Sequence, residues 1–236
     1  MTLQEIVDRS RRIVFFGGAG VSTESGISDF RSVDGLYHQQ YDYPPEQILS
    51  RSFFDENPAE FYRFYRSKML CPHAKPNAAH YKLAELEQAG KCTAVVTQNI
   101  DGLHQAAGSR TVYELHGSVL RNHCMRCGRA YGVEAVAEAA GIPRCACGGI
   151  IKPDVVLYEE GLDQQTVEGA VHAIARADCL IVAGTSLSVY PAAGFIRYFQ
   201  GDHFVLINRD PTPADKLADL VLHQKVGQVL SQIQVR

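Results

Sequence analysis

Ile13-Val-Phe-Phe-Gly-Gly-Ala-Gly-Val-Ser22 joins a short apolar run directly to a glycine-rich turn. The run at residues 13–16 has no polar alternation, which is typical of a strand buried on both faces of a parallel sheet. Glycines after such a strand let backbone N–H groups approach a phosphate closely. Thr23 stands where the usual dinucleotide fingerprint has a glycine, so the turn does not predict an ordinary dehydrogenase site. The alternative is a tight turn that binds nothing.

Three more apolar runs resemble the first, at residues 93–97, 179–183 and 204–207. Helical segments lie between the runs. Asn57-Pro58 is a helix start for a segment that reaches about residue 69, and Asn77 caps a second helix that stops at Gly90. Further helices are predicted at residues 163–175 and 212–217. Strands that alternate with helices predict an α/β fold with an open, mostly parallel sheet covered on both faces.

Two segments interrupt this alternation, at residues 32–69 and 120–152. The first is rich in Tyr, Phe, Gln and Pro, and the second holds two cysteine pairs. We interpret both as excursions from the sheet that form a smaller second lobe. A cleft between two lobes is a favoured place for a ligand.

The cysteine pairs are Cys124-Met-Arg-Cys127 and Cys145-Ala-Cys147, separated by 17 residues. Four thiolates at this spacing suit a tetrahedral structural zinc ion. His123 adjoins the first pair and could compete as a ligand. The chain has seven cysteines, an odd number that serves a secreted disulfide framework poorly and favours a reducing cytoplasm.

Composition excludes several classes of protein. The 236 residues suffice for a large core, and 23 basic against 26 acidic residues give a net charge of −3. This balance does not predict binding to nucleic acid or to a membrane surface. No apolar run approaches the roughly 18 residues of a membrane span.

Polar residues follow each predicted strand, where open α/β sheets bind ligands. Gln98, Asn99 and Asp101 follow the run at 93–97, and His116 follows a later apolar segment. Two further strand ends carry Gly184-Thr185-Ser186 and Asn208. Imidazole titrates near neutrality, so His116 is a candidate general base, with His104 and His123 as rivals. Ordinary turn chemistry is the alternative at each strand end.

Taken together, these motifs resemble those of the sirtuins, the NAD-dependent protein deacylases. They occur in one order over about residues 10–230: Gly18-Ala-Gly-Val-Ser22, Gly26-Ile-Ser-Asp-Phe-Arg31, Thr97-Gln-Asn-Ile-Asp101, Leu115-His-Gly117, the cysteine pairs, Gly184-Thr-Ser186 and Asn208. The resemblance implies a Rossmann-like parallel sheet domain with a smaller inserted helical and zinc-binding domain. It divides the chain into a large domain (1–34, 77–119 and 153–236), a cofactor loop with small-domain helices (35–76) and a zinc-binding module (120–152).

The resemblance also implies the activity and its residues. The activity is NAD-dependent deacetylation of protein lysines, which releases nicotinamide, free lysine and O-acyl-ADP-ribose. His116 would be the general base, and Asn99 and Asp101 would assist cleavage of the nicotinamide bond. NAD would be held by Gly18, Ala19, Gly20, Ser22, Thr23, Phe30, Arg31, Gln98, Asn99, Ile100, Asp101, His116, Gly184, Thr185, Ser186, Asn208 and Val226. One structural Zn²⁺ would be bound by Cys124, Cys127, Cys145 and Cys147. The acyl-lysine substrate would pair with Val155, Val156, Leu157, Tyr158 and Glu159.

Three departures from the family pattern affect these expectations. The second cysteine pair is one residue short, which requires a tighter turn at the metal. Glu159 replaces the usual glycine of the substrate segment, which leads us to expect a preference for basic residues beside the acyl-lysine. Tyr62 and Tyr65 match the positions where members that remove succinyl groups carry a Tyr-x-x-Arg pair. An uncharged acyl group is therefore favoured over succinyl or malonyl.

Two alternative functions remain open at this point. The first is a mono-ADP-ribosyltransferase on the same scaffold, which would need less from a base such as His116. The second is a zinc-ribbon module that binds nucleic acid, against which the balanced charge argues. The sequence makes no prediction about the oligomeric state.

Overall fold

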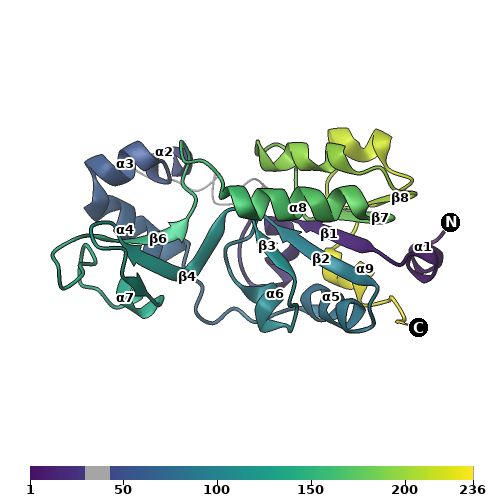
Figure 1. Cartoon of the computed structure of the whole chain (residues 1–236), viewed down its shortest axis with the longest axis horizontal. Helices are drawn as coiled ribbons and strands as arrows, with labels where there is room; N and C mark the ends of the chain where they lie inside the picture. The colour runs from purple at the N-terminus through teal and green to yellow at the C-terminus, as the bar shows by residue number, and fades with distance from the viewer. Residues whose placement is uncertain (30–42, 236) are drawn as a thin grey trace.

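A six-stranded parallel sheet forms the centre of the larger lobe in the computed structural model, which describes residues 1–29 and 43–235 (Figure 1). Its strands, in spatial order, are β3 (Val112–Glu114), β2 (Cys92–Thr97), β1 (Ile13–Gly17), β7 (Cys179–Ala183), β8 (His203–Ile207) and β9 (Leu220–Leu222). The strand order reverses beside β1, which is where open α/β sheets bind ligands. The four predicted strands are confirmed, whereas β3 and β9 were not predicted.

Helices cover both faces of this sheet. One face packs against α1 (Leu3–Arg9), α5 (Ala78–Gln88) and α9 (Val226–Leu230), and the other against α8 (Gln164–Arg176) and η4 (Ala192–Tyr198). Successive residues of a strand point to opposite faces, so Phe15 contacts the first group of helices and Phe16 the second. Both rings are fully buried. This two-sided burial explains why the strand has no polar residue.

The predicted helix starts are confirmed by their capping contacts. The side chain of Asn57 accepts a hydrogen bond from the Glu60 amide at the start of α4 (Pro58–Lys68), and Asn77 caps α5 in the same way. Asp163 caps α8. The segment predicted at residues 212–217 forms η5 (Pro213–Leu217), a short 3₁₀ helix.

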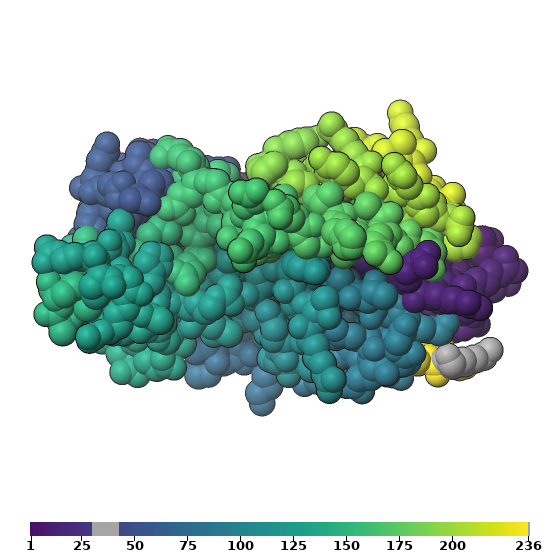
Figure 2. Space-filling view, in the orientation of Figure 1, coloured from purple at the N-terminus to yellow at the C-terminus, as the bar shows by residue number. Residues whose placement is uncertain are grey.

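A second, antiparallel sheet organises the smaller lobe. Its strands are β5 (Ala130–Tyr131), β4 (Gly117–Cys124) and β6 (Ile151–Val155). It shares one apolar core with the helices α2 (Pro45–Ile48), α3 (Arg51–Glu56), α4 and α7 (Glu134–Ala137). The helices α2, α3, α4 and α7 and the strands β4 and β6 thus lie together at one end of the molecule, away from both termini (Figures 1 and 2). As far as the structure describes them, the two predicted excursions build one lobe.

The predicted boundary at residues 119/120 falls inside β4, and the boundary at 152/153 falls inside β6. Both strands belong to the antiparallel sheet of the smaller lobe, so that sheet begins before residue 120 and ends after residue 152. Within the described ranges, no helix combines the length and apolar character needed to cross a bilayer.

Two histidines pack against each other beneath the larger lobe's surface. His80 of α5 and His104 of α6 (Leu103–Ala106) have ring centroids 4.7 Å apart and exposed fractions of 0% and 1%. Nδ1 of His80 accepts a hydrogen bond from the Asn77 amide. Burial lowers the pKa of His80 to about 4 and that of His104 to about 3. Both rings are therefore neutral in the folded protein at neutral pH.

This buried pair predicts that the protein loses stability in acid. Below pH 6.5, the ordinary histidine value, the unfolded chain binds protons that the folded chain excludes until about pH 4. The free energy of unfolding should fall with decreasing pH over this window, by about 1.4 kcal/mol per pH unit for each histidine. Urea denaturation at pH 7, 6 and 5 measures the slope. His104→Phe should flatten it, and His172→Asn, at an exposed position of α8, is the control. Equal slopes in wild type and His104→Phe would contradict the assignment.

Candidate active site

A cleft of about 1190 Å³ lies at the carboxyl ends of β1, β2, β7 and β8 and extends to the smaller lobe. The residues that follow these strands line it: Gly18, Gln98, Gly184 and Asn208. Parallel strands bring their carboxyl ends to one edge of the sheet, so segments far apart in the chain meet here.

The glycine-rich turn is packed tightly against the end of β7. The amide of Gly20 donates to the carbonyl of Gly184 over 2.8 Å, and a Cβ on Gly20 would lie 2.8 Å from the Gly184 Cα. Any side chain at this position would push the two loops apart. The turn continues as two short 3₁₀ helices, η1 (Ala19–Val21) and η2 (Thr23–Ser25). Glycine is therefore required here for the packing of two cleft loops, as well as for access to the backbone.

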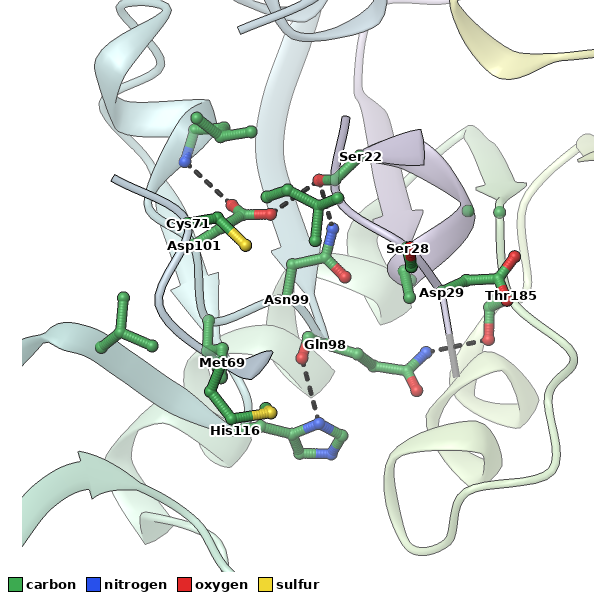
Figure 3. Close-up of a pocket in the computed structure, with 18 of the residues that line it drawn as sticks. Ser22, Ser28, Asp29, Met69, Cys71, Gln98, Asn99, Asp101, His116 and Thr185 are labelled. Atoms are coloured by element: carbon green, nitrogen blue, oxygen red, sulfur yellow. Dashed lines mark hydrogen bonds between the residues drawn. The ribbon is translucent and has the colours of Figure 1, made fainter. Parts of the chain in front are cut away.

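Three polar side chains form a hydrogen-bonded chain in the cleft (Figure 3). Nδ2 of Asn99 donates to Oγ of Ser22 over 3.0 Å, and Oγ of Ser22 donates to Oδ2 of Asp101 over 2.6 Å. The second carboxylate oxygen, Oδ1 of Asp101, accepts from the Leu103 amide at 2.9 Å. Each member is thus fixed by its neighbour, and the orientation of the Asn99 amide is set by Ser22.

The ring of His116 is oriented by the backbone of Gln98. Nδ1 of His116 lies 3.1 Å from the carbonyl oxygen of Gln98. A carbonyl only accepts, so Nδ1 carries the proton and Nε2 keeps its lone pair. Burial lowers the pKa of His116, and the hydrogen bond to Gln98 opposes this shift. The neutral ring is the form that a general base requires.

The rival histidines do not reach the cleft. His104 is buried against His80, and His123 pairs with Asp154 on the smaller lobe. Neither lines the cleft, whereas His116 does. His123 also lies outside the four-cysteine cluster, which answers the question of whether it competes as a ligand.

At the opposite end of the cleft, residues that follow three different strands are hydrogen-bonded to one another. Nε2 of Gln98 donates to Oγ1 of Thr185 over 3.1 Å, and the Thr185 amide donates to Oδ1 of Asn208 over 2.9 Å. Val226 lines the cleft at the first turn of α9, where the next amide, that of Gly227, donates to Oε2 of Glu24. Sequence reasoning missed Glu24, which connects α9 to η2, the short helix that follows the glycine-rich turn.

Every described residue that we predicted to bind NAD or substrate lines this one cleft. Phe30 and Arg31 lie outside the described residues. The sequence did not reveal that the loop after α4 also lines the cleft. Figure 3 shows Met69 of that loop on the side of His116, and Cys71 beside Asp101. No spacing pattern marks such positions, because only the packing of α4 brings the loop to the cleft.

The predicted substrate segment forms one wall of the cleft. Val155 ends β6, and the Val156 amide donates to the carbonyl of His116 over 3.0 Å. Because this bond connects the segment directly to the catalytic candidate, a peptide held along the segment would lie near the imidazole.

Tyr62 and Tyr65 do not line the cleft, where the family resemblance led us to expect them. Both are fully buried in the core of the smaller lobe and neither lines the cleft. The hydroxyl of Tyr62 donates to the carbonyl of Ile151 over 2.6 Å. These residues therefore support the small-lobe core, and the argument from them about the acyl group is not supported by their position.

The four predicted metal ligands come together at the end of β4. All four Sγ atoms lie within 4.8 Å of one another, with Cys124 3.5 Å from Cys147 and Cys127 3.6 Å from Cys145. Zn–S bonds of about 2.3 Å in a tetrahedron place sulfur atoms about 3.8 Å apart, so the cluster fits zinc. A hydrogen bond from the Cys147 amide, with a second from Tyr131, lowers the pKa of Cys145 to about 6, and such donors favour the thiolate that a metal requires. At Cys147, the hydrogen bond from the Gly149 amide lowers the pKa, but the hydrogen bonds with the other three cysteines, led by Cys124, together with burial outweigh it and raise the pKa to about 11.

The shortened pair is accommodated by a tight turn, as the spacing required. The amide of Gly148 donates to the carbonyl of Cys145, and the Cys145 amide donates to the carbonyl of Gly149, each over 2.8 Å. Gly148 has φ of +83°, which a glycine adopts without strain. The turn thus presents both sulfur atoms to the cluster.

Comparison with known proteins identifies the same family. The Sir2 family model matches residues 18–191. An NAD-dependent protein deacetylase of Clostridium perfringens (strain 13 / Type A) is 56% identical over 235 residues, which cover 98% of this chain and 96% of the relative. The same enzyme of Clostridium acetobutylicum is 57% identical with the same coverage.

Solved structures agree with these relatives. A Sir2 structure from work on the mechanism and regulation of Sir2 enzymes has a TM-score of 0.88 and 43% identity, covering 97% of this chain and 93% of that one. A Sir2 complex with a p53 peptide and NAD⁺ has a TM-score of 0.85 and 40% identity, covering 98% and 96%. The expectation drawn from the motifs is confirmed: this chain belongs to the Sir2 family.

Proposed function

We propose that this protein is an NAD-dependent protein-lysine deacetylase that transfers the acyl group to ADP-ribose and releases nicotinamide and free lysine. The observation that carries the proposal is the neutral, oriented His116 in the same cleft as the Asn99–Ser22–Asp101 chain. Relatives of this chain are NAD-dependent protein deacetylases, and related Sir2 structures hold peptide together with NAD⁺ or acetyl-ADP-ribose.

His116 is proposed as the general base. NAD supplies the ribose carbon that accepts the amide oxygen of acyl-lysine, with nicotinamide as the leaving group. Nε2 of His116, left free by the Nδ1 contact with Gln98, would take the proton of a ribose hydroxyl that attacks the acyl carbon. Holding the weak amide nucleophile beside the ribose is the other main contribution of the cleft.

Asn99 and Asp101 are proposed to bind the nicotinamide end of NAD. Ser22 connects the two side chains, so both are already ordered before NAD binds. The remaining cleft residues at the ends of β1, β7 and β8 would hold the phosphates and adenosine. Val155 to Glu159 would pair with the substrate backbone as an added strand.

The four cysteines would hold one structural zinc ion. Four thiolates would complete a tetrahedral site and leave no position for a reacting water. A further proposal is the division of the chain into a large domain, cofactor-loop helices and a zinc module, which limited proteolysis tests.

A cytoplasmic location is also proposed. All seven cysteines are free thiols in the structure, and four of them form a metal site that oxidation would destroy. Cell fractionation with an antibody against the protein checks this location.

One assay tests the function. The protein is incubated with NAD and an acetyl-lysine peptide, and nicotinamide, free peptide and O-acetyl-ADP-ribose are quantified by mass spectrometry. We expect the three products in equal amounts. ADP-ribose attached to protein without loss of acetyl would support the mono-ADP-ribosyltransferase alternative. No NAD-dependent turnover, together with binding to nucleic acid, would support the zinc-ribbon alternative.

A further inference from the structure

Glu159 adopts a backbone conformation that side chains other than glycine rarely take. Its φ is +75°, in the left-handed region. Glu159 is exposed and lines the cleft within the proposed substrate segment. A residue held in this conformation needs contacts that compensate for the strain.

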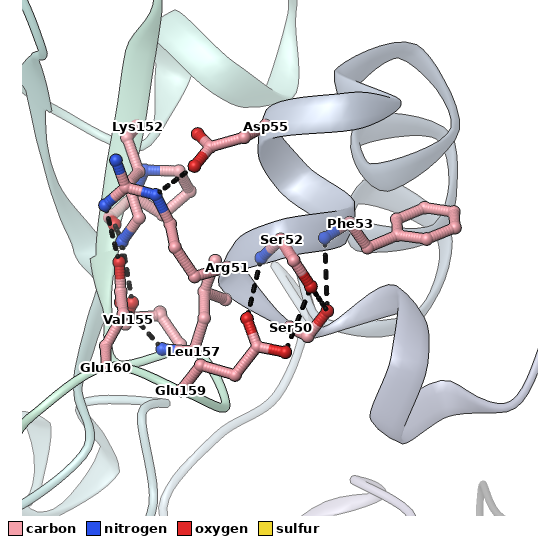
Figure 4. A network of polar contacts seen from close by, with 11 residues as sticks. Ser50, Arg51, Ser52, Phe53, Asp55, Lys152, Val155, Leu157, Glu159 and Glu160 are labelled. Atoms are coloured by element: carbon pink, nitrogen blue, oxygen red, sulfur yellow. Dashed lines mark hydrogen bonds and ion pairs between the residues drawn. The ribbon is translucent and has the colours of Figure 1, made fainter.

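Those contacts come from the start of α3 (Figure 4). The Ser52 amide donates to Oε2 of Glu159 over 2.9 Å, and the Ser52 hydroxyl donates to Oε1 over 3.0 Å. Both carboxylate oxygens are thus bound by one residue of the smaller lobe. A charged acceptor makes each bond stronger than a bond between neutral groups.

The residues on either side of Glu159 are anchored to the same region. The Tyr158 amide donates to the Leu49 carbonyl over 2.9 Å, and the Arg51 amide donates to the Tyr158 carbonyl over 3.0 Å. Glu160 binds the buried Lys152, Arg51 and the Leu157 amide. The turn at Glu159 is therefore fixed before and after the residue, and Ser52 fixes the residue itself.

The backbone of Glu159 is left available by this arrangement. Its N–H and C=O make no hydrogen bond to any residue in the described ranges. Unpaired backbone groups on a cleft wall are what an added peptide strand requires. The Ser52 contacts also give this glutamate a structural role, besides the negative charge that it presents at the cleft.

We propose that Glu159 is a positioning residue for the acyl-lysine peptide. Its carboxylate, bound at Ser52, holds the left-handed turn so that the unpaired backbone groups of Glu159 are ordered before the peptide arrives. A glycine would permit the same turn but would not hold it. This inference rests on the proposed deacetylase function, since it concerns the peptide side of that cleft.

The test is a steady-state comparison in which the acetyl-lysine peptide is varied at saturating NAD. Loss of two charge-assisted hydrogen bonds at an exposed site should raise the peptide KM of Glu159→Ala by about three- to tenfold. The KM for NAD should stay within about twofold, because the change affects only the peptide wall. In Glu159→Gln, the amide oxygen can accept from the Ser52 amide and its NH₂ can donate to the hydroxyl, so peptide KM should recover. Glu159→Gly should show the raised KM.

Two further variants serve as controls. Glu56→Ala removes an equal charge from the exposed side of the same helix and should leave all constants unchanged. Ser52→Ala deletes only the hydroxyl contact, so it tests the contact from the other side and should raise the peptide KM by a smaller factor, about twofold.

Two results would overturn the proposal. An unchanged peptide KM in Glu159→Ala would show that the Ser52 contacts do not order the peptide wall. The second result would be a peptide KM that is raised as much in Glu159→Gln as in Glu159→Ala, but only for peptides with Lys or Arg beside the acetyl-lysine. The carboxylate would then recognise the charge of the substrate. Peptide binding measured by fluorescence anisotropy without NAD separates this inference from the function. If the wild type bound peptide more tightly than Glu159→Ala but showed no turnover, the deacetylase function would be refuted and the role of Glu159 in peptide binding would stand.

Discussion

Replacing His116 with asparagine should lower kcat for NAD-dependent deacetylation by about 100- to 10,000-fold, the usual range for loss of a general base. The asparagine amide can still donate to the Gln98 carbonyl as Nδ1 does now, so the local structure is kept. What disappears is the free nitrogen that accepts the ribose proton. The measurement is product formation at saturating NAD and peptide.

The pH dependence gives a second readout of the same residue. The base must be neutral, and burial lowers the pKa of His116 below the ordinary value of 6.5. The neutral form therefore persists into mild acid, and the acidic limb of kcat should lie below pH 6.5 in the wild type. This limb should be absent from the residual activity of His116→Asn. A variant that kept more than a tenth of wild-type kcat, with unchanged thermal unfolding, would contradict the role.

The sheet could be predicted from the sequence because its central strands are buried on both faces. Phe15 and Phe16 pack on opposite helix layers, so apolar residues run without interruption and stand out in the sequence. The edge strand β9 has only three residues, each half-buried. Such short, partly exposed strands leave no pattern that distinguishes them from a loop.

The cleft could be predicted because its residues follow strands directly. Gln98 and Thr185 each lie within two residues of a strand end, and the sheet brings these ends together. Met69 and Cys71 instead depend on how α4 packs, which no local pattern records. The buried contact between His80 and His104 is of the same kind, since it joins two helices by tertiary packing.

The directions in which side chains point could not be predicted for Tyr62, Tyr65 and Glu159. The i, i+3 spacing of Tyr62 and Tyr65 correctly places both on one side of α4, but this helix also buries Phe61 and Phe64. An aromatic helix of this kind does not reveal which face meets the ligand. For Glu159, the departure from glycine marks an unusual residue in the sequence, but only the structure shows that Ser52 of α3 binds its carboxylate.

Loss of the four-cysteine site is expected to have the second large effect. Cys124→Ser should abolish stoichiometric zinc binding and lower kcat/KM for the peptide by at least about 100-fold. Structural zinc contributes about 10–16 kcal/mol in small zinc-binding peptides, which is as much as a whole domain's stability. Cys124 and Cys145 also belong to the apolar core that holds α2 to α4, so metal loss should unfold that lobe. Zinc content, limited proteolysis and turnover measure the three consequences.

The control for this variant is Cys92→Ala, a buried thiol of β2 outside the cluster, which should keep both zinc and activity. The larger lobe has two cores of its own on the faces of its sheet, so protease cuts in Cys124→Ser should concentrate between residues 43 and 76 and between 117 and 155. Activity would then be lost because the peptide wall, Val155 to Glu159, and the loop with Met69 are both attached to the unfolded lobe. Full deacetylation by a chelated, metal-free protein would refute this dependence, since it would show that the wall keeps its position without the metal.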